Sequence, residues 1–132
     1  MSKKRPKNCI SVKDAKELEK TWCDTRTPEI DKCLKFVDTR EFEWSVEELM
    51  DYLKYVKRKS KKQGILNPGV RVYLGAYPKE KCKMERGYST VFFAPTGTAE
   101  RSEGKGGAVR MPNNYKIKPF NGGGSGNPPF SY

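Results

Sequence analysis

The side chains best suited to acid–base chemistry are five acids that precede and begin a predicted helix: Asp38, Glu41, Glu43, Glu47 and Glu48. Paired carboxylates carry out glycoside hydrolysis, and carboxylate oxygens also bind hard cations. The spacing of these acids does not match a calcium-binding loop, however. Acids near a helix N-terminus also interact favourably with the positive end of the helix dipole. We take this structural role as the better interpretation.

The chain contains no histidine. Histidine is the commonest general base near neutral pH, so its absence excludes Ser-His and Cys-His dyads and histidine metal sites. The four cysteines, Cys9, Cys23, Cys33 and Cys82, include no CxxC pair, which argues against a zinc ribbon or a redox motif. Cys23 and Cys33 have apolar neighbours, and we interpret them as small core residues.

We therefore predict that the protein is not an enzyme and has no catalytic, cofactor-binding or metal-binding residue. A small enzyme that uses Cys82 or a carboxylate is the weakest alternative. A catalytic cysteine would need a thiolate of lowered pKa, which its reactivity toward thiol reagents would reveal.

The net charge of +11 comes almost entirely from two short runs. They hold ten of the 27 basic residues, and the remaining 17 nearly balance the 16 acidic residues. The runs contain Lys3, Lys4, Arg5 and Lys7 at the N-terminus, and Lys54, Lys57, Arg58, Lys59, Lys61 and Lys62 near the end of a predicted helix. Localised positive charge attracts nucleic acid, anionic lipid or an acidic protein surface. Lysines at a helix C-terminus also stabilise the helix dipole, so both interpretations stay open.

A basic and aromatic surface is predicted on one strand, where Arg71, Tyr73 and Tyr77 share a face and Tyr88 lies opposite. Aromatic side chains on strands can stack on nucleic-acid bases, but the signature of an RNA-recognition domain is absent. The alternative is that another segment, such as the Gly-rich tail, half-buries these tyrosines. The glycine cluster at 122–126 does not predict a phosphate loop, because prolines follow it and no helix can begin there.

The elements that position these side chains lie in one block from Ser45 to Gly97. Ser45 and Glu48 form a capping box, and apolar residues then recur at helical spacing until Gly64 ends a helix over 46–63. A turn at 67–69 leads into an antiparallel hairpin with strands at 70–77 and 88–94. Because two strands alone are rarely stable, a third must come from 42–44, from 109–117 or from a partner chain.

Two shorter helices are predicted before this block. Ser11 caps the first helix, and Thr27 caps the second with Pro28 at its first position. The predicted fold is α+β, with three N-terminal helices packed on a small, mainly antiparallel sheet. We expect a basic flexible arm at 1–10, a single α+β domain at 11–96, and a Gly/Pro-rich loop and tail at 97–132 that wraps the domain.

The strings at 45–49, 63–78 and 89–96, including Asn-Pro-Gly at 67–69 and Arg-Val-Tyr-Leu-Gly-Ala-Tyr-Pro at 71–78, resemble a family of small proteins from Bacteroidetes-group bacteria, especially flavobacteria. The resemblance extends to Trp22 and to Asn127-Pro128-Pro129. It implies a bacterial cytoplasmic protein. It supplies no activity and no role for any residue.

The prediction for function is a non-enzymatic binding or regulatory module that works through the Arg/Tyr face and the basic end of the long helix. The alternative is a nucleic-acid-associated protein that contacts phosphates through its basic runs. We expect no cofactor, and a partner that is either a protein or a polyanion. No stretch approaches the ~20 apolar residues of a membrane span, and no apolar segment follows the basic N-terminus. We therefore expect a cytoplasmic location and no membrane contact.

Overall fold

The computed structural model describes residues 4–78, 87–100 and 110–132. These residues form three helices and two small antiparallel sheets, and the α+β prediction is confirmed. The chain divides into two compact units, one of Met1–Glu41 with Gly126–Tyr132 and one of Phe42–Ser125. The domain limits predicted at 10 and 96 stay a prediction. Lys3, Cys82 and residues 101–109 of the loop and tail predicted at 97–132 lie outside the described residues.

The first unit begins with α1 (Val12–Thr25) and α2 (Thr27–Leu34). The Ser11 hydroxyl accepts the backbone N–H of Asp14 at 3.0 Å, as predicted for the cap of α1. The prediction that Thr27 caps α2 is wrong, because Arg26 occupies that position and Thr27 is already helical. Arg26 keeps a right-handed helical backbone and bonds to the carbonyl of Trp22. Thr27 therefore lies within α2 and cannot act as its N-cap.

Polar contacts join the end of the chain to the segment that follows α2. The Thr39 hydroxyl donates to the Asn127 side-chain oxygen at 2.6 Å, and the Phe130 N–H donates to the Glu41 carboxylate at 2.7 Å. Arg40 pairs with Glu19 of α1 at 3.3 Å. Neither α1 nor α2 contains a buried residue. These three contacts are polar, and neither helix adds a buried apolar residue to this unit.

The second unit contains β1 (Phe42–Glu43), α3 (Val46–Lys62), β2 (Gly69–Ala76), β3 (Ser89–Thr96) and β4 (Gly124–Ser125). The capping box is confirmed at the start of α3, where the Ser45 hydroxyl accepts the Glu48 N–H at 3.0 Å. At the other end, Gly64 adopts a φ of 76°. The Ile65 N–H then reaches the Ser60 carbonyl at 2.9 Å, which completes a Schellman motif. Local sequence therefore specifies both ends of α3.

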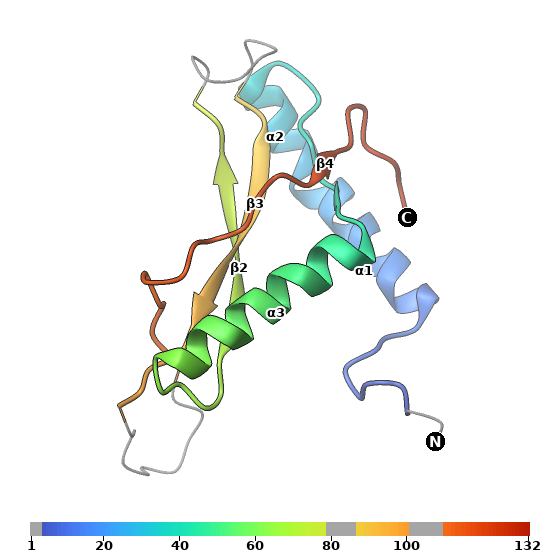
Figure 1. The fold of residues 1–132 in the computed structure, drawn as a ribbon. Coiled ribbons are helices and arrows are strands. Elements are labelled where there is room, and N and C mark those ends of the chain that lie inside the picture. Colours follow the sequence, from blue (N-terminus) through green and yellow to red (C-terminus); the bar gives the residue numbers. More distant parts are fainter. Residues whose placement is uncertain (1–3, 79–86, 101–109) are drawn as a thin grey trace. The chain divides into compact units, whose positions relative to one another are not determined.

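The predicted hairpin is confirmed as β2 paired with β3, which lie side by side in Figure 1. Val72 lies opposite Phe93 in this pairing. On the other edge of β3, isolated bridges join Phe93 to Phe120 and Thr96 to Asn113. A third segment therefore borders the hairpin, as expected because two strands alone are rarely stable. It extends further along the chain than the predicted 109–117, and β1 pairs with β4 in a separate ribbon.

The core of this unit lies where α3 meets the segment beside β3. Tyr52, Val56 and Ile117 form its buried cluster, and Tyr55, Phe93 and Phe120 pack around them. The Tyr52 and Phe120 rings stack with their centroids 4.6 Å apart. Gly123 passes so close to Trp44 that a Cβ there would lie 2.7 Å from the indole ring. Part of the glycine cluster is thus explained by close packing of the backbone against an aromatic ring.

The two faces of β2 alternate as predicted, but the apolar face is the exposed one. Val70, Val72 and Leu74 are 37%, 56% and 78% exposed, whereas Arg71 and Tyr73 are half-buried. The alternation shows which residues share a face. Which face is covered depends on contacts with the distant segment at 111–121.

Candidate functional site

The outward face of α3 carries a compact group of cations. Lys54, Lys57, Arg58 and Lys61 recur at helical spacing and therefore share one face, with Lys59 and Lys62 on its flanks. All but Lys59 are exposed. The ion pairs between described residues are Lys20–Asp24 and Arg40–Glu19, so none of these six cations has one. We call Lys54, Lys57, Arg58, Lys59, Lys61 and Lys62 the basic face of α3.

The opposite face of α3 holds the helix in place. Tyr52, Val56 and Ser60 recur every four residues and are buried. The Tyr52 hydroxyl donates to the Lys118 carbonyl at 3.0 Å, and the Tyr55 hydroxyl accepts the Lys118 N–H at 3.3 Å. Burial, with a smaller contribution from Tyr55, raises the pKa of Tyr52 to about 12. The phenol is therefore neutral at physiological pH and keeps its proton for the bond to Lys118.

Arg71 and Tyr73 of the predicted Arg/Tyr face are engaged by the segment after residue 110. The Arg71 guanidinium donates to the Asn113 side chain and, at 2.8 Å, to the Met111 carbonyl. The Asn113 amide donates to the Tyr73 hydroxyl at 2.7 Å. This bond, with a further contribution from Arg71, lowers the pKa of Tyr73. The Tyr73 ring stacks on Phe92 with 5.3 Å between centroids, so one of its faces is already occupied.

The two remaining members of this face differ in exposure. The Tyr77 hydroxyl donates to the Asn121 side chain at 2.7 Å, and Tyr77 keeps 39% of its surface exposed. Tyr88, whose carbonyl accepts the Tyr77 N–H at 3.0 Å, is buried. Arg71, Tyr73 and Tyr77 are thus brought together with partners that sequence reasoning missed, Asn113 and Asn121. The Asn-Asn pair at 113–114 inside a Gly-rich tail was the only signal for them.

Two hollows flank Phe92 on the same side of the hairpin. One, of about 370 Å³, is lined by Tyr73, Phe92, Asn113 and Tyr115, among others. The other, of about 360 Å³, is lined by Tyr77, Phe92, Asn121 and others. Tyr73 and Asn113 in the first hollow hydrogen-bond to each other, as do Tyr77 and Asn121 in the second. They explain how the tail rests on the hairpin and define no ligand site by themselves.

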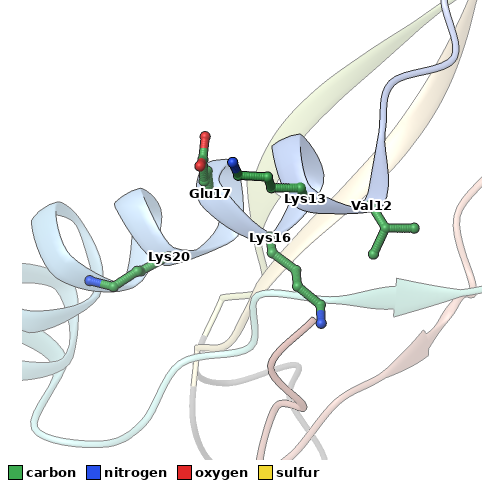
Figure 2. A pocket seen from close by; sticks show the side chains of 5 residues that line it. All are labelled: Val12, Lys13, Lys16, Glu17 and Lys20. Carbon is green, nitrogen blue, oxygen red and sulfur yellow. The ribbon is translucent and has the colours of Figure 1, made fainter.

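A further hollow of about 460 Å³ lies on α1 (Figure 2). Its lining combines Val12 with Glu17 and three lysines, Lys13, Lys16 and Lys20. Figure 2 shows Lys13 beside Glu17, while Lys16 and Lys20 point in other directions. Lys20 also pairs with Asp24. These cations point in different directions, whereas the cations on α3 share one face and have no ion pair with a described residue.

Most of the predicted acids lie at the start of α3 or accept backbone hydrogen bonds. Glu47 and Glu48 lie in the first turn of α3, as the dipole interpretation predicts. Asp38 accepts the Thr39 N–H, and Glu41 accepts the Phe130 N–H. Within residues 4–78, 87–100 and 110–132, no three Cys, Asp or Glu side chains are grouped so that they could hold a metal ion.

The prediction that Cys33 is a core residue is wrong, because α2 buries nothing and this thiol is exposed. Cys23 is partly buried and donates to Glu19 at 3.3 Å. Desolvation and this bond raise the pKa of the Cys23 thiol. A raised pKa disfavours the thiolate, so the Cys23 thiol is not activated as a nucleophile.

No protein-family model matches the chain, and no curated protein or solved structure matches it either. Among the helices that the structure describes, none has both the length and the apolar character needed to cross a membrane.

Proposed function

We propose that the protein is a non-enzymatic binding or regulatory module and that the basic face of α3 holds its ligand, a polyanion. The observation that carries this proposal is the group of six cations on one helix, none of which is neutralised by an ion pair with a described residue. An anionic ligand would supply the missing counter-charges. The Arg/Tyr face contributes less, because Arg71 and Tyr73 already have intramolecular partners.

The spacing on α3 suits a row of negative charges rather than a single small anion. Lys54 and Lys61 are separated by about 10 Å along the helix axis, at 1.5 Å per residue. Four cations spread over this length can contact several phosphates or carboxylates of a chain at once. Because the core contacts of Tyr52 and Val56 fix the helix, little backbone ordering is required on binding.

Nucleic acid is the more specific candidate for the polyanion. The observation that favours it is the second basic run, whose described members Lys4, Arg5 and Lys7 are exposed. Nucleic acid is long enough to neutralise more than one basic run. Base stacking is not part of this candidate, since Tyr73 is stacked on Phe92 and Tyr88 is buried. We therefore expect binding that depends on charge and shows little preference for sequence.

Fluorescence anisotropy tests the proposal with labelled single-stranded and duplex oligonucleotides and with labelled poly-glutamate. We expect binding at low salt. If four cations contact phosphates, affinity for duplex should fall about 100-fold between roughly 50 and 200 mM salt. Binding to oligonucleotides but not to poly-glutamate would favour the nucleic-acid candidate. The absence of binding to all three probes at low salt would contradict a polyanion ligand.

A panel of generic hydrolase and transferase substrates tests the non-enzymatic part. We expect no turnover, because the described residues bring together no nucleophile and general base. Turnover of any of these substrates by the purified protein would overturn this part alone, and its loss in Cys82→Ser would identify Cys82 as the nucleophile. The cytoplasmic location, the bacterial family and the packing of all three helices on the sheet stay predictions.

A further inference from the structure

Among the described residues, no strand pairs with the outer edge of β2, and the direction of each backbone N–H and C=O group along this strand can be deduced. The Tyr77 N–H bonds to Tyr88 beside β3. Backbone groups in an antiparallel pair alternate between the two sides of a strand. Gly75, Tyr73 and Arg71 therefore turn their N–H and C=O groups toward β3, as Tyr77 does. Those of the other residues, Val70, Val72, Leu74 and Ala76, point away from the hairpin.

The backbone bonds at the outer edge of β3 confirm this orientation of the β2 backbone groups. Phe93 lies opposite Val72 and exchanges two backbone bonds with Phe120, at 2.8 and 2.9 Å. Each β3 residue that lies opposite an even-numbered residue of β2 therefore turns its backbone N–H and C=O groups toward the outer edge of β3. That edge is occupied by the segment at 112–120. In the part of the chain that the structure describes, no segment occupies the edge of β2.

This edge also lacks the features that usually protect edge strands. Such strands commonly carry lysine, proline or a bulge, which prevent another strand from pairing. Between Gly69 and Ala76 the only charged residue is Arg71, and its guanidinium is bonded to Asn113 and Met111. The side chains of Val70, Val72 and Leu74 are exposed on one face. Neither the outward backbone groups nor the apolar side chains of β2 are thus covered by another described segment.

We propose that β2 pairs with β2 of a second copy of this chain, antiparallel and about a two-fold axis at Tyr73. In this register Val72 faces Leu74 of the second copy and Val70 faces Ala76, so all the outward backbone groups of the strand find partners. The exposed apolar side chains also meet on one face. Arg71 faces Gly75 of the second copy, so no like charges are opposed.

The neighbouring registers are poorer. With the axis at Val72 or at Leu74, an outward residue faces Pro68 or Pro78, which has no N–H to donate. With the axis at Arg71, the two arginines face each other. Because segment 112–120 covers the far edge of each hairpin, the pairing closes at two copies and does not continue into a fibre.

This inference concerns a different surface from the basic face of α3 and does not depend on the proposed function. The proposed dimer and the proposed polyanion complex also respond oppositely to salt. Each copy carries a net charge of +11, so repulsion opposes the dimer and added salt should strengthen it. Polyanion binding should weaken under the same change. The failure of one proposal is therefore distinguishable from the failure of the other.

Amide hydrogen exchange and sedimentation velocity test the pairing with the full chain. We expect a dimer in which the amides of Val72 and Leu74 gain protection as protein concentration rises. The amides of Arg71, Tyr73 and Gly75 should be protected at every concentration, because they bond to β3. Leu74→Lys should weaken the dimer by at least about tenfold, since it places a cation beside the apolar pairs.

Leu66→Lys is the matched control, because it makes the same chemical change at a residue that is 90% exposed and outside β2. It should dimerise as the wild type does. A chain that stays monomeric at millimolar concentration, with rapid exchange at Val72 and Leu74, would overturn the proposal and leave this edge to a different protein. Assemblies larger than two, or equal weakening by both lysine substitutions, would also overturn it.

Discussion

The two capped helices α1 and α3 both carry rows of lysines, yet only α3 buries one of its faces. Ser11 and Ser45 cap their helices in the same way. α3 buries Tyr52, Val56 and Ser60, whereas α1 buries none of its residues. The α1 lysines alternate with Glu17, Glu19 and Asp24, while the basic run of α3 has no acid within it. A charged helix face becomes a candidate binding surface when its helix is fixed by packing and its charges lack partners.

The largest expected effect sharpens the packing side of this comparison. Ile117, almost fully buried beside Tyr52 and Val56, is a good site for truncation. Ile117→Ala should destabilise the second unit by about 3 kcal/mol, because the methyl groups leave a cavity. Leu18→Ala in α1, where the side chain is 66% exposed, should change stability by less than about 0.5 kcal/mol. Urea unfolding followed by Trp44 fluorescence in a Trp22→Phe background measures the first, and helical circular dichroism the second.

Equal losses from the two truncations would contradict the difference in packing. So would a second unit that tolerates Ile117→Ala without a shift in its urea midpoint.

A smaller effect concerns the hydrogen bond that holds α3 to the backbone of Lys118. Tyr52→Phe should cost about 1 kcal/mol at neutral pH, because it leaves a carbonyl without its donor. The pKa of Tyr52 is raised to about 12 in the folded chain, above its ordinary value near 10. Its contribution is therefore fully present below pH ~10 and is lost as the pH rises toward the folded value.

The difference in unfolding free energy between wild type and Tyr52→Phe should thus shrink above pH ~10. Urea titrations of both proteins at increasing pH measure it, and the titration of lysines cancels because both proteins share them. A difference that stays constant or grows with pH would show that the phenol is not held neutral by burial.

An effect of similar size to that of Tyr52→Phe has the opposite sign. The Ser60 hydroxyl is fully buried and has no hydrogen-bond partner among the residues that the structure describes. Ser60→Ala removes this unsatisfied group and improves helix propensity, so it should stabilise the second unit by about 1 kcal/mol. A shift of the urea midpoint to higher concentration measures this gain. Destabilisation instead would mean that the hydroxyl makes a bond that matters for folding.

Local patterns predicted the elements well, because their signals lie within a few residues. The Ser45–Glu48 cap, the Gly64 stop and the alternation along β2 depend on neighbouring residues, and all three were predicted. The Arg26 cap of α2 was missed because two helices meet there with one residue between them.

Long-range contacts could not be predicted from the same local patterns. The pairing of Arg71 and Tyr73 with Asn113 spans about 40 residues, and a Gly-rich tail has no periodicity to reveal it. For the same reason, sequence showed which residues of β2 share a face but not that the apolar face is exposed. The basic run of α3 was visible in the sequence, whereas the structure was needed to show that it forms no ion pair with a described residue.

The most direct test of the central claim compares matched charge removals on the two helices. Lys57→Gln/Lys61→Gln removes two cations from the basic face of α3, and Lys13→Gln/Lys16→Gln removes two from α1. We expect the first pair to weaken duplex binding by at least about tenfold and to reduce the slope of log affinity against log salt by about 2. The second pair should leave that slope unchanged and affinity within about threefold. Equal effects from the two pairs, or no effect from the first, would contradict a ligand held by α3.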